Sequence, residues 1–198
     1  MLKDLEIKRK LFHMIIGILI VILVDLNIIN PLIITIILVL GIITSIISTK
    51  IKIPILYWFL KNMDRKSDIK KYPGKGAITF LLGIILTLIL FERNTALASI
   101  LILTIGDAVS PIVGMHFGKI KNPLNNKKLI EGTIVGIFTA SIAASIFINY
   151  KEAIIASVVG MIVEAIELKI HKGYAIDDNI TVPLVAGITI SILKSLGI

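Results

Sequence analysis

The chain alternates between long apolar runs and short polar stretches, a pattern that predicts transmembrane helices. Seven apolar runs stand out, at residues 11–29, 31–49, 76–91, 94–117, 130–149, 152–168 and 179–197. A helix needs about 20 mostly apolar residues, with about 17 as the lower limit, to cross the hydrocarbon core of a bilayer. Each run reaches or approaches this length. We therefore predict an all-α, polytopic transmembrane helical bundle of about seven spans, forming a single domain over residues 1–198.

The basic residues lie in alternate loops, which predicts the orientation of the bundle. Of the 21 lysines and arginines, only Arg93, Lys151 and Lys194 lie outside the N-terminal segment and the loops that follow the second, fourth and sixth runs. Loops rich in lysine and arginine stay on the cytoplasmic side. We therefore predict a cell-membrane, multi-pass protein with a cytoplasmic N-terminus. The opposite loops are too short to hold a site, so any active site is expected on the cytoplasmic side.

Composition excludes several classes of protein and site. Hydrophobic residues make up 56% of the chain and the mean hydropathy is +0.97, whereas soluble proteins are usually about 45–50% apolar. There are no cysteines, so disulfides, thiolate nucleophiles and cysteine metal sites are excluded. His13, His116 and His171 show no zinc-ligand spacing. The net charge of +8 is explained by membrane topology, and no aromatic-interleaved basic motif predicts nucleic acid as a partner. The abundance of isoleucine, lysine and asparagine, with no glutamine, suggests a prokaryotic source.

The longest loop, residues 52–75, contains an amphipathic pattern. Apolar residues at i, i+3 and i+4 precede three basic residues; these are Ile55, Trp58, Phe59, Lys61, Arg65 and Lys66. That pattern is typical of a helix lying on the lipid headgroups. The alternative is an ordinary connecting loop.

Asp107 lies inside the fourth apolar run. An ionisable group at membrane depth costs at least about 2.5–3.5 kcal/mol, so it is a candidate functional residue by default. On a helix, Ser110, Gly114 and Gly118 would share its face, and this small, polar face suits either close helix contact or a ligand. Pro111 is expected to kink the helix near Asp107. The alternative is a buried aspartate that only bonds a neighbouring helix.

Two further clusters stand at helix starts. Pro73-Gly74-Lys75-Gly76 opens the third run, where free backbone N–H groups and the helix dipole attract phosphate; it lacks the Walker A spacing, and a plain turn is the alternative. Lys127 and Lys128 precede Glu131, Gly132 and Thr133. These residues could bind phosphates and Mg²⁺ together, or could simply flank a helix start.

The last cluster is acidic. Glu164 and Glu167 lie at i and i+3 near the end of the sixth run, and Asp177, Asp178 and Asn179 precede the seventh. Hard oxygen donors of this kind suit Mg²⁺, although they also suit a helix cap. All three clusters and Asp107 are expected near the cytoplasmic face. Carboxylates, lysines and glycines gathered at helix ends are what phosphoryl transfer from a metal nucleotide requires.

Four segments, in order, resemble a known family. These are the segment from Glu6 through Arg9, Lys10 and His13; Pro73 to Gly83; Gly106-Asp107 through Gly118-Lys119 to Lys128, Glu131, Gly132 and Thr133; and Glu164-Ala165 with Asp177-Asp178-Asn179 to Leu184. The family is that of the membrane CTP-dependent lipid-alcohol kinases, which includes dolichol kinase, phytol kinase and the CTP-dependent diacylglycerol kinase and is related to CDP-diglyceride synthase. Lys128 stands where many relatives have serine.

The resemblance implies transfer of the γ-phosphate of CTP to a long-chain prenyl alcohol with Mg²⁺ or another divalent cation. It implies catalytic roles for Asp107, Asp178 and Asn179, and metal ligands among Asp107, Asp177, Asp178 and Glu164. The implied nucleotide-binding residues are Lys75, Gly76, Gly114, Lys119, Lys128, Glu131 and Gly132. Arg9, Lys10 and His13 are expected at the mouth of the site, near the nucleotide or the headgroup.

Other functions stay open on sequence alone. A cytidylyltransferase that makes a CDP-lipid would share much of the site, but the acidic signature of the synthases with its His-Gly-Gly segment is missing. A diacylglycerol-type kinase would differ only in its acceptor. A small transporter would use Asp107 and Glu164 as intramembrane carriers, but no path of polar residues leads outward. Which alcohol is used, and the oligomeric state, are not encoded in a readable pattern.

Overall fold

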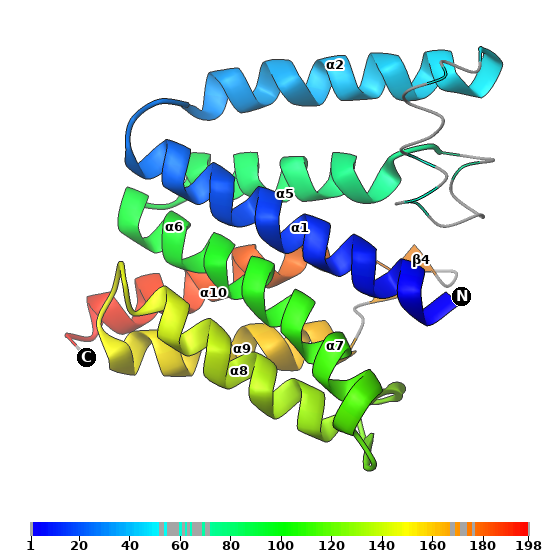
Figure 1. The fold of residues 1–198 in the computed structure, drawn as a ribbon. Helices are drawn as coiled ribbons and strands as arrows, with labels where there is room; N and C mark the ends of the chain where they lie inside the picture. Colours follow the sequence, from blue (N-terminus) through cyan, green and yellow to red (C-terminus); the bar gives the residue numbers. More distant parts are fainter. Residues whose placement is uncertain are drawn as a thin grey trace.

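The computed structural model describes residues 2–51, 54, 60, 62, 64, 69, 72–166, 169–170, 174–175 and 177–197. The predicted all-α class is confirmed, and a long helix lies at each apolar run (Figure 1). These helices are α1 (Leu2–Asp25), α2 (Pro31–Lys50), α5 (Lys75–Leu90), α6 (Arg93–Leu101), α8 (Ile130–Ala144), α9 (Tyr150–Ile166) and α10 (Asp178–Ser195). The fourth run is one continuous helix in which α6 leads through a π-helix, η1 (Ile102–Gly106), into α7 (Asp107–Phe117).

Some boundaries differ from the apolar runs. Helix α1 begins nine residues before the predicted span, because the polar N-terminal segment continues the same helix, and α8 ends at Ala144, five residues early. Two antiparallel hairpins, which the sequence did not predict, join helices. One pairs β1 (Lys121–Asn122) with β2 (Asn125–Leu129), and the other pairs β3 (Lys169–Ile170) with β4 (Tyr174–Ala175).

The structure tests the membrane prediction only in part. Among the described helices, α2 and the continuous helix over residues 93–117 are long and apolar enough to cross a membrane, while α5 and α8 are apolar but shorter. Most of the large apolar side chains of α2 are exposed, including Leu32 and Ile46. The number of spans and their orientation stay predictions. The predicted interfacial helix falls largely on residues outside the described part of the chain.

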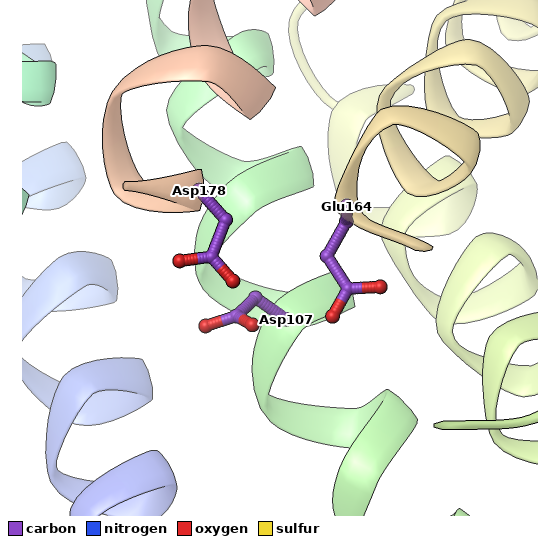
Figure 2. A group of neighbouring side chains, drawn as sticks. All are labelled: Asp107, Glu164 and Asp178. Atoms are coloured by element: carbon purple, nitrogen blue, oxygen red, sulfur yellow. The ribbon is translucent and has the colours of Figure 1, made fainter. Parts of the chain in front are cut away.

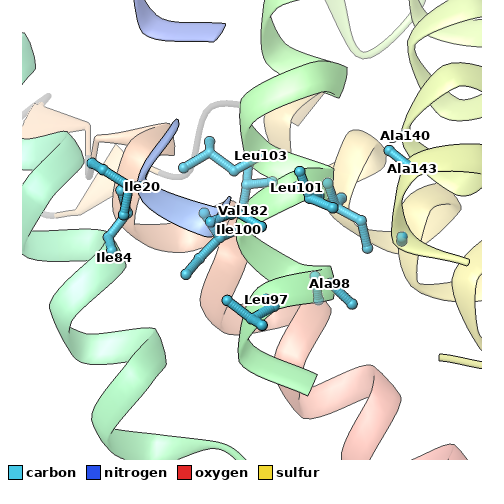
Figure 3. Close-up of a cluster of buried hydrophobic side chains, with 14 of the residues drawn as sticks. Ile20, Ile84, Leu97, Ala98, Ile100, Leu101, Leu103, Ala140, Ala143 and Val182 are labelled. Atoms are coloured by element: carbon cyan, nitrogen blue, oxygen red, sulfur yellow. The ribbon is translucent and has the colours of Figure 1, made fainter. Parts of the chain in front are cut away.

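The core is a cluster of branched apolar side chains around the α6–η1 segment. Ile100 and Ile102 are fully buried, and they pack with side chains of α1, α5, α8 and α10 such as Ile20, Ile84 and Val182 (Figure 3). This apolar packing fills the middle of the bundle.

The chain connections divide the bundle into two ends, visible in Figure 1. The hairpin end carries the N-terminus, both hairpins, the last turn of α7 and the first turns of α5, α8 and α10. The tight-turn end carries the C-terminus and the short connections at residues 26–30, 91–92 and 145–149. Glycines hold the hairpin end together: a Cβ on Gly83 would lie 2.0 Å from the Asn179 carbonyl oxygen, and a Cβ on Gly132 would lie 2.1 Å from that of Ser110.

Candidate active site

Asp107 stands where the π-helix returns to α-helix. The widened turn of η1 ends at Gly106, one turn ahead of Pro111, which is where the sequence predicts a distortion. Short π-helical segments occur often at functional sites. The aspartate is only 5% exposed, so its carboxylate depends on protein partners for its hydrogen bonds.

Lys10 of α1 supplies that partner. Its ammonium donates to both carboxylate oxygens of Asp107, each at 2.5 Å. The approach is possible because Gly17, two turns further along α1, lies directly against Thr104 of η1; a Cβ there would be 2.5 Å from the Thr104 side chain. Lys10 lies just before the predicted first span, and although burial alone would lower its pKa, the carboxylates of Asp107 and Asp178 raise it. The Lys10–Asp107 ion pair therefore joins α1 to α7 at the site.

A second buried ion pair lies beside the first. Lys128, at the end of β2, donates to Glu164 Oε1 and to the Glu164 backbone carbonyl, both at 2.5 Å. Glu164 is 3% exposed. Its other carboxylate oxygen, Oε2, is buried and has no hydrogen-bond partner among the described residues, and an unpaired buried oxygen of this kind is costly unless a ligand completes it.

The start of α10 completes the acidic group. Asp177 caps the helix by accepting the backbone N–H of Asn179 at 3.2 Å, and Asn179 donates to the Thr79 hydroxyl at 3.1 Å and to the Gly76 carbonyl at 3.4 Å. The Asp178 carboxylate accepts no hydrogen bond within the described part of the chain. Asp178 precedes the predicted seventh span, and burial together with the nearby charge of Asp107 raises its pKa to about 6.

Three of these carboxylates converge from three helices. Asp107, Glu164 and Asp178 each offer an oxygen within 4.8 Å of the other two (Figure 2). An all-oxygen set suits Mg²⁺, which is usually held by one or two carboxylates and by substrate phosphates. The unpartnered Oε2 of Glu164 supports this fit. Asp177 is not part of the group, and Glu167 lies outside the described residues.

Two cavities open on the carboxylate group. The smaller, about 150 Å³, is lined by α1, the start of α5, the start of α10 and residues Leu60 and Asp64. The larger, about 320 Å³, is lined by α1, α7, β2, Glu164 and Asp178. Lys10, Asp107 and Asp178 line both. The three shared side chains therefore form the boundary between the cavities.

The predicted nucleotide and mouth residues are divided between these cavities. Arg9, His13, Lys75 and Gly76 line the smaller one. Gly114 and Lys128 line the larger one.

Lys119, Glu131 and Gly132 line neither cavity. The Glu131 carboxylate instead accepts the backbone N–H groups of Lys119 at 2.8 Å and Ile120 at 3.1 Å, which fastens the first hairpin to α8. Gly132 provides the close contact between α8 and α7.

The small face of α7 both lines the larger cavity and contacts a neighbouring helix. Asp107, Ser110 and Gly114 are buried on it, whereas Gly118 has left the helix and is extended. Gly114 faces Leu129 and Gly132.

Sequence reasoning missed two features of the site. It placed Lys10 at the mouth of the site, which stays a prediction, but it did not predict that this lysine binds Asp107 directly; nothing in the sequence marks one lysine of many as that partner. It did not single out Asp64, whose carboxylate accepts the N–H of Gly74 at 2.7 Å and steadies a turn with a positive φ of 75°. The only sequence signal for Asp64 was the Pro73-Gly74 turn, because the Gly74 backbone N–H requires a hydrogen-bond acceptor.

Comparison with known proteins shows that this chain has relatives that are similar over most of its length. The sequence is 30% identical over 190 residues to an uncharacterized protein of Methanocaldococcus jannaschii, covering 94% of this chain and 93% of that protein. It is 31% identical over 200 residues to an uncharacterized protein of Rickettsia prowazekii, covering 91% of each.

Two further relatives have named activities. Farnesol kinase of Arabidopsis thaliana is 29% identical over 146 residues, which is 65% of this chain and 46% of that protein. CTP-dependent diacylglycerol kinase 1 of Eremothecium gossypii is 26% identical over 86 residues, which is 43% of this chain and 26% of that protein. No family model and no solved structure matches.

Proposed function

We propose that this chain, which belongs to the family of the Methanocaldococcus jannaschii protein, is a CTP-dependent lipid kinase acting on a long-chain prenyl alcohol. Similarity to two lipid kinases supports the reaction class. The structural observation that carries the proposal is the convergence of the buried Asp107 and Glu164 with the half-buried Asp178, together with two lysines. Such a group suits a divalent cation and phosphates.

The residues divide the work of phosphoryl transfer. Asp107, Glu164 and Asp178 would hold Mg²⁺, which neutralises charge on the transferring phosphate when it is bound. Lys10 and Lys128 would bind phosphate oxygens. The alcohol oxygen forms a bond to the γ-phosphorus, the bond from that phosphorus to the bridging oxygen breaks, and CDP leaves. Asp178, whose carboxylate lies on the boundary of both cavities, takes the alcohol proton.

The surface of the bundle supports a membrane location. Large apolar side chains are exposed along α1, α2, α8 and α10, for example Ile15, Ile36, Phe138 and Ile188. Contiguous exposed apolar surface of this extent marks contact with lipid or with another protein. We propose a multi-pass protein of the cell membrane whose hairpin end faces the cytoplasm, where CTP is available.

Two rivals fit less well. A cytidylyltransferase would use the same metal group, but both relatives with named activities are kinases. A transporter needs a polar path through the bundle, whereas apolar side chains fill its middle.

The decisive experiment follows the phosphorus of labelled CTP. Purified protein in detergent is given Mg²⁺, CTP and a panel of prenyl alcohols, diacylglycerol and lipid phosphates. Transfer of γ-label to an alcohol, with release of CDP, establishes the kinase. Transfer of α-label to a lipid phosphate, with release of pyrophosphate, would show a CDP-lipid synthase instead. No transfer to any acceptor would leave the transporter as the better account.

A further inference from the structure

The first hairpin and the residue that ends α7 bury a polar side chain and expose apolar ones. Asn122 is 5% exposed, whereas Phe117, Ile120 and Leu124 are 74%, 59% and 51% exposed. A hairpin with water on its outer side normally shows the reverse pattern, with apolar side chains inside and polar ones outside. Grouped apolar side chains exposed in this way mark a surface that contacts lipid or another protein.

Hydrogen bonds on the inner side of the hairpin hold this arrangement. The Asn122 amide donates to the Thr133 hydroxyl at 3.3 Å, and its oxygen accepts the backbone N–H of Leu124 at 2.9 Å. The backbone N–H of Ile130 donates to the Ile120 carbonyl at 3.0 Å. These bonds fasten the hairpin to the start of α8, so turning Ile120 and Leu124 inward would break them.

The charge of this segment is positive throughout. Between Asp107 and Glu131 the chain carries four lysines and no acidic residue. Two of these, Lys119 and Lys121, are exposed and flank Ile120. Apolar side chains interleaved with lysines are typical of segments that lie in the bilayer interface, where the apolar groups enter the acyl boundary and the ammonium groups meet anionic headgroups.

The neighbouring helices bring the hairpin to the membrane surface. The continuous helix over residues 93–117, which is long and apolar enough to cross a membrane, ends at Phe117, and the hairpin joins it to α8 (Figure 1). On α8 the exposed Ile134, Phe138 and Ile142 lie at i, i+4 and i+8, so one face of that helix is apolar from its second turn onward. The hairpin therefore lies where the apolar helix surface ends.

We propose that the surface formed by Phe117, Lys119, Ile120, Lys121 and Leu124, here called the hairpin face, docks onto the cytoplasmic surface of the bilayer. Its three apolar side chains lie below the lipid phosphates, and its two lysines bind anionic headgroups. This inference rests on the membrane location in the proposed function. The occupant is a lipid surface and not a second protein, because the core of a protein interface is depleted in lysine.

The docked hairpin connects the bilayer surface to the candidate active site. Lys127, Lys128 and Leu129 of β2 line the larger cavity, and Lys128 reaches Glu164. Lipid contact on the hairpin face holds this wall of the cavity next to the headgroups, which is where a lipid acceptor presents its polar group.

A spin label on the hairpin tests the docking. Because the chain has no cysteines, Leu124→Cys gives a single labelling site in the whole protein, which is reconstituted in phosphatidylcholine bilayers with or without phosphatidylglycerol. Collisions of the label with oxygen, which concentrates in the bilayer, are compared with collisions with a water-soluble nickel chelate. We expect oxygen to dominate at position 124. The nickel chelate should dominate for Asn126→Cys, an exposed polar position of the same hairpin.

Lys121→Gln tests the headgroup contact. A lysine near an anionic surface contributes about a fivefold preference for the docked position. In bilayers with phosphatidylglycerol, the ratio of immersed to water-exposed label at position 124 should therefore fall about fivefold when Lys121→Gln is added. The ratio in phosphatidylcholine alone should stay the same. Lys151→Gln, an exposed lysine at the tight-turn end, is the matched control, and an equal fall in both variants would reject the headgroup contact.

The other outcomes overturn the docking. A label at position 124 that meets mainly the nickel chelate would place the hairpin face in water. A label shielded from both reagents would place it against another protein or a second copy of this chain. Ile120→Cys repeats the measurement at a second exposed position, in case Leu124→Cys does not fold.

These readouts also separate the docking from the proposed reaction, because they need no substrate. An immersed label in a protein that transfers no γ-phosphate would reject the kinase and keep the docking. A protein that stays in solution without detergent would reject the membrane location and the docking together.

Discussion

Both ends of the bundle carry ion pairs, but the pairs differ in how far their side chains are exposed to solvent. At the hairpin end, the side chains of Lys10 and Asp107 are 12% and 7% exposed, and those of Lys128 and Glu164 are 19% and 4% exposed. At the tight-turn end, the side chains of Arg93 and Asp25 are 44% and 48% exposed, and Lys194 pairs with an 80% exposed Glu92.

The contrast is between ion pairs that are largely buried and ion pairs that are exposed to solvent. Burying an ion pair costs desolvation that its attraction often fails to offset, so a buried pair is weak evidence for stability. Two adjacent buried pairs with an unpaired oxygen are better explained by a ligand. Exposed pairs contribute about 0–1 kcal/mol and require no such explanation. Matched substitutions at the two ends should therefore give very different results.

The largest effect is expected from Asp107→Asn. The amide loses the negative charge that faces Lys10 and that would face the proposed metal ion, so kcat should fall at least about 10²–10³-fold. The measurement is the initial rate of γ-phosphate transfer, with size-exclusion chromatography to show that the protein is folded. Asp25→Asn at the tight-turn end is the matched control and should keep full activity. A folded Asp107→Asn protein with more than about a tenth of wild-type activity would remove Asp107 from the mechanism.

Glu164→Gln should weaken binding of the proposed Mg²⁺ ion. The amide keeps the shape and a hydrogen-bonding oxygen for Lys128 but removes the negative charge of a proposed metal ligand. We expect the Mg²⁺ concentration for half-maximal activity to rise about 10–100-fold. Glu92→Gln serves as the control because Glu92 pairs with Lys194 at the other end. An unchanged Mg²⁺ dependence would show that Glu164 does not bind the ion.

Glycine substitutions compare the packing of the two ends. A Cβ on Gly132 meets the Ser110 backbone carbonyl at 2.1 Å, whereas a Cβ on Gly187, towards the tight-turn end, meets the Phe91 ring at 2.4 Å. A ring can rotate away and a helix backbone cannot. Gly132→Ala should therefore destabilise by about 2–3 kcal/mol and Gly187→Ala by about 1 kcal/mol. Thermal or denaturant unfolding in detergent measures both, and the reverse order would contradict the packing argument.

The smallest effect is expected from Lys194→Met. Its ammonium donates to the exposed Glu92 at 3.1 Å and, in a part-buried contact, to the Thr95 hydroxyl at 3.0 Å. The loss should be below about 1 kcal/mol in unfolding free energy, with kcat/KM unchanged. A loss of activity at this distance from the site would mean that the two ends are coupled.

The sequence predicted the helices more completely than their contacts. Apolar runs locate the helices because burial and lipid contact both require apolar residues over a whole helix length. The first hairpin was missed because β1 and β2 are short and polar, and what fastens them is the Glu131 carboxylate bonding backbone N–H groups. Patterns of side-chain polarity do not report such contacts.

The sequence predicted which residues form the site, but it did not predict which of them contact each other. Asp107, Glu164 and Asp178 were expected near one face, and the structure brings them together. Lys10 and Asp107 are 97 positions apart, and the chain offers many other lysines. Their pairing depends on Gly17 meeting Thr104, which is a property of three-dimensional packing. The division of the predicted nucleotide residues between two cavities was equally invisible in the sequence.

The π-helix before Asp107 has a consequence for how this site tolerates insertion and deletion. A π-helical turn holds one residue more than an α-helical turn, so η1 amounts to a single inserted residue in an otherwise regular helix. Removing one residue from Ile102–Gly106 would restore regular geometry and keep the segment just as apolar. It would also rotate everything beyond it by about 100° and turn Asp107 away from Lys10. Deletion of one isoleucine from this segment would therefore leave the hydropathy profile almost unchanged. It would nevertheless remove the Asp107 carboxylate from the site and abolish the proposed reaction.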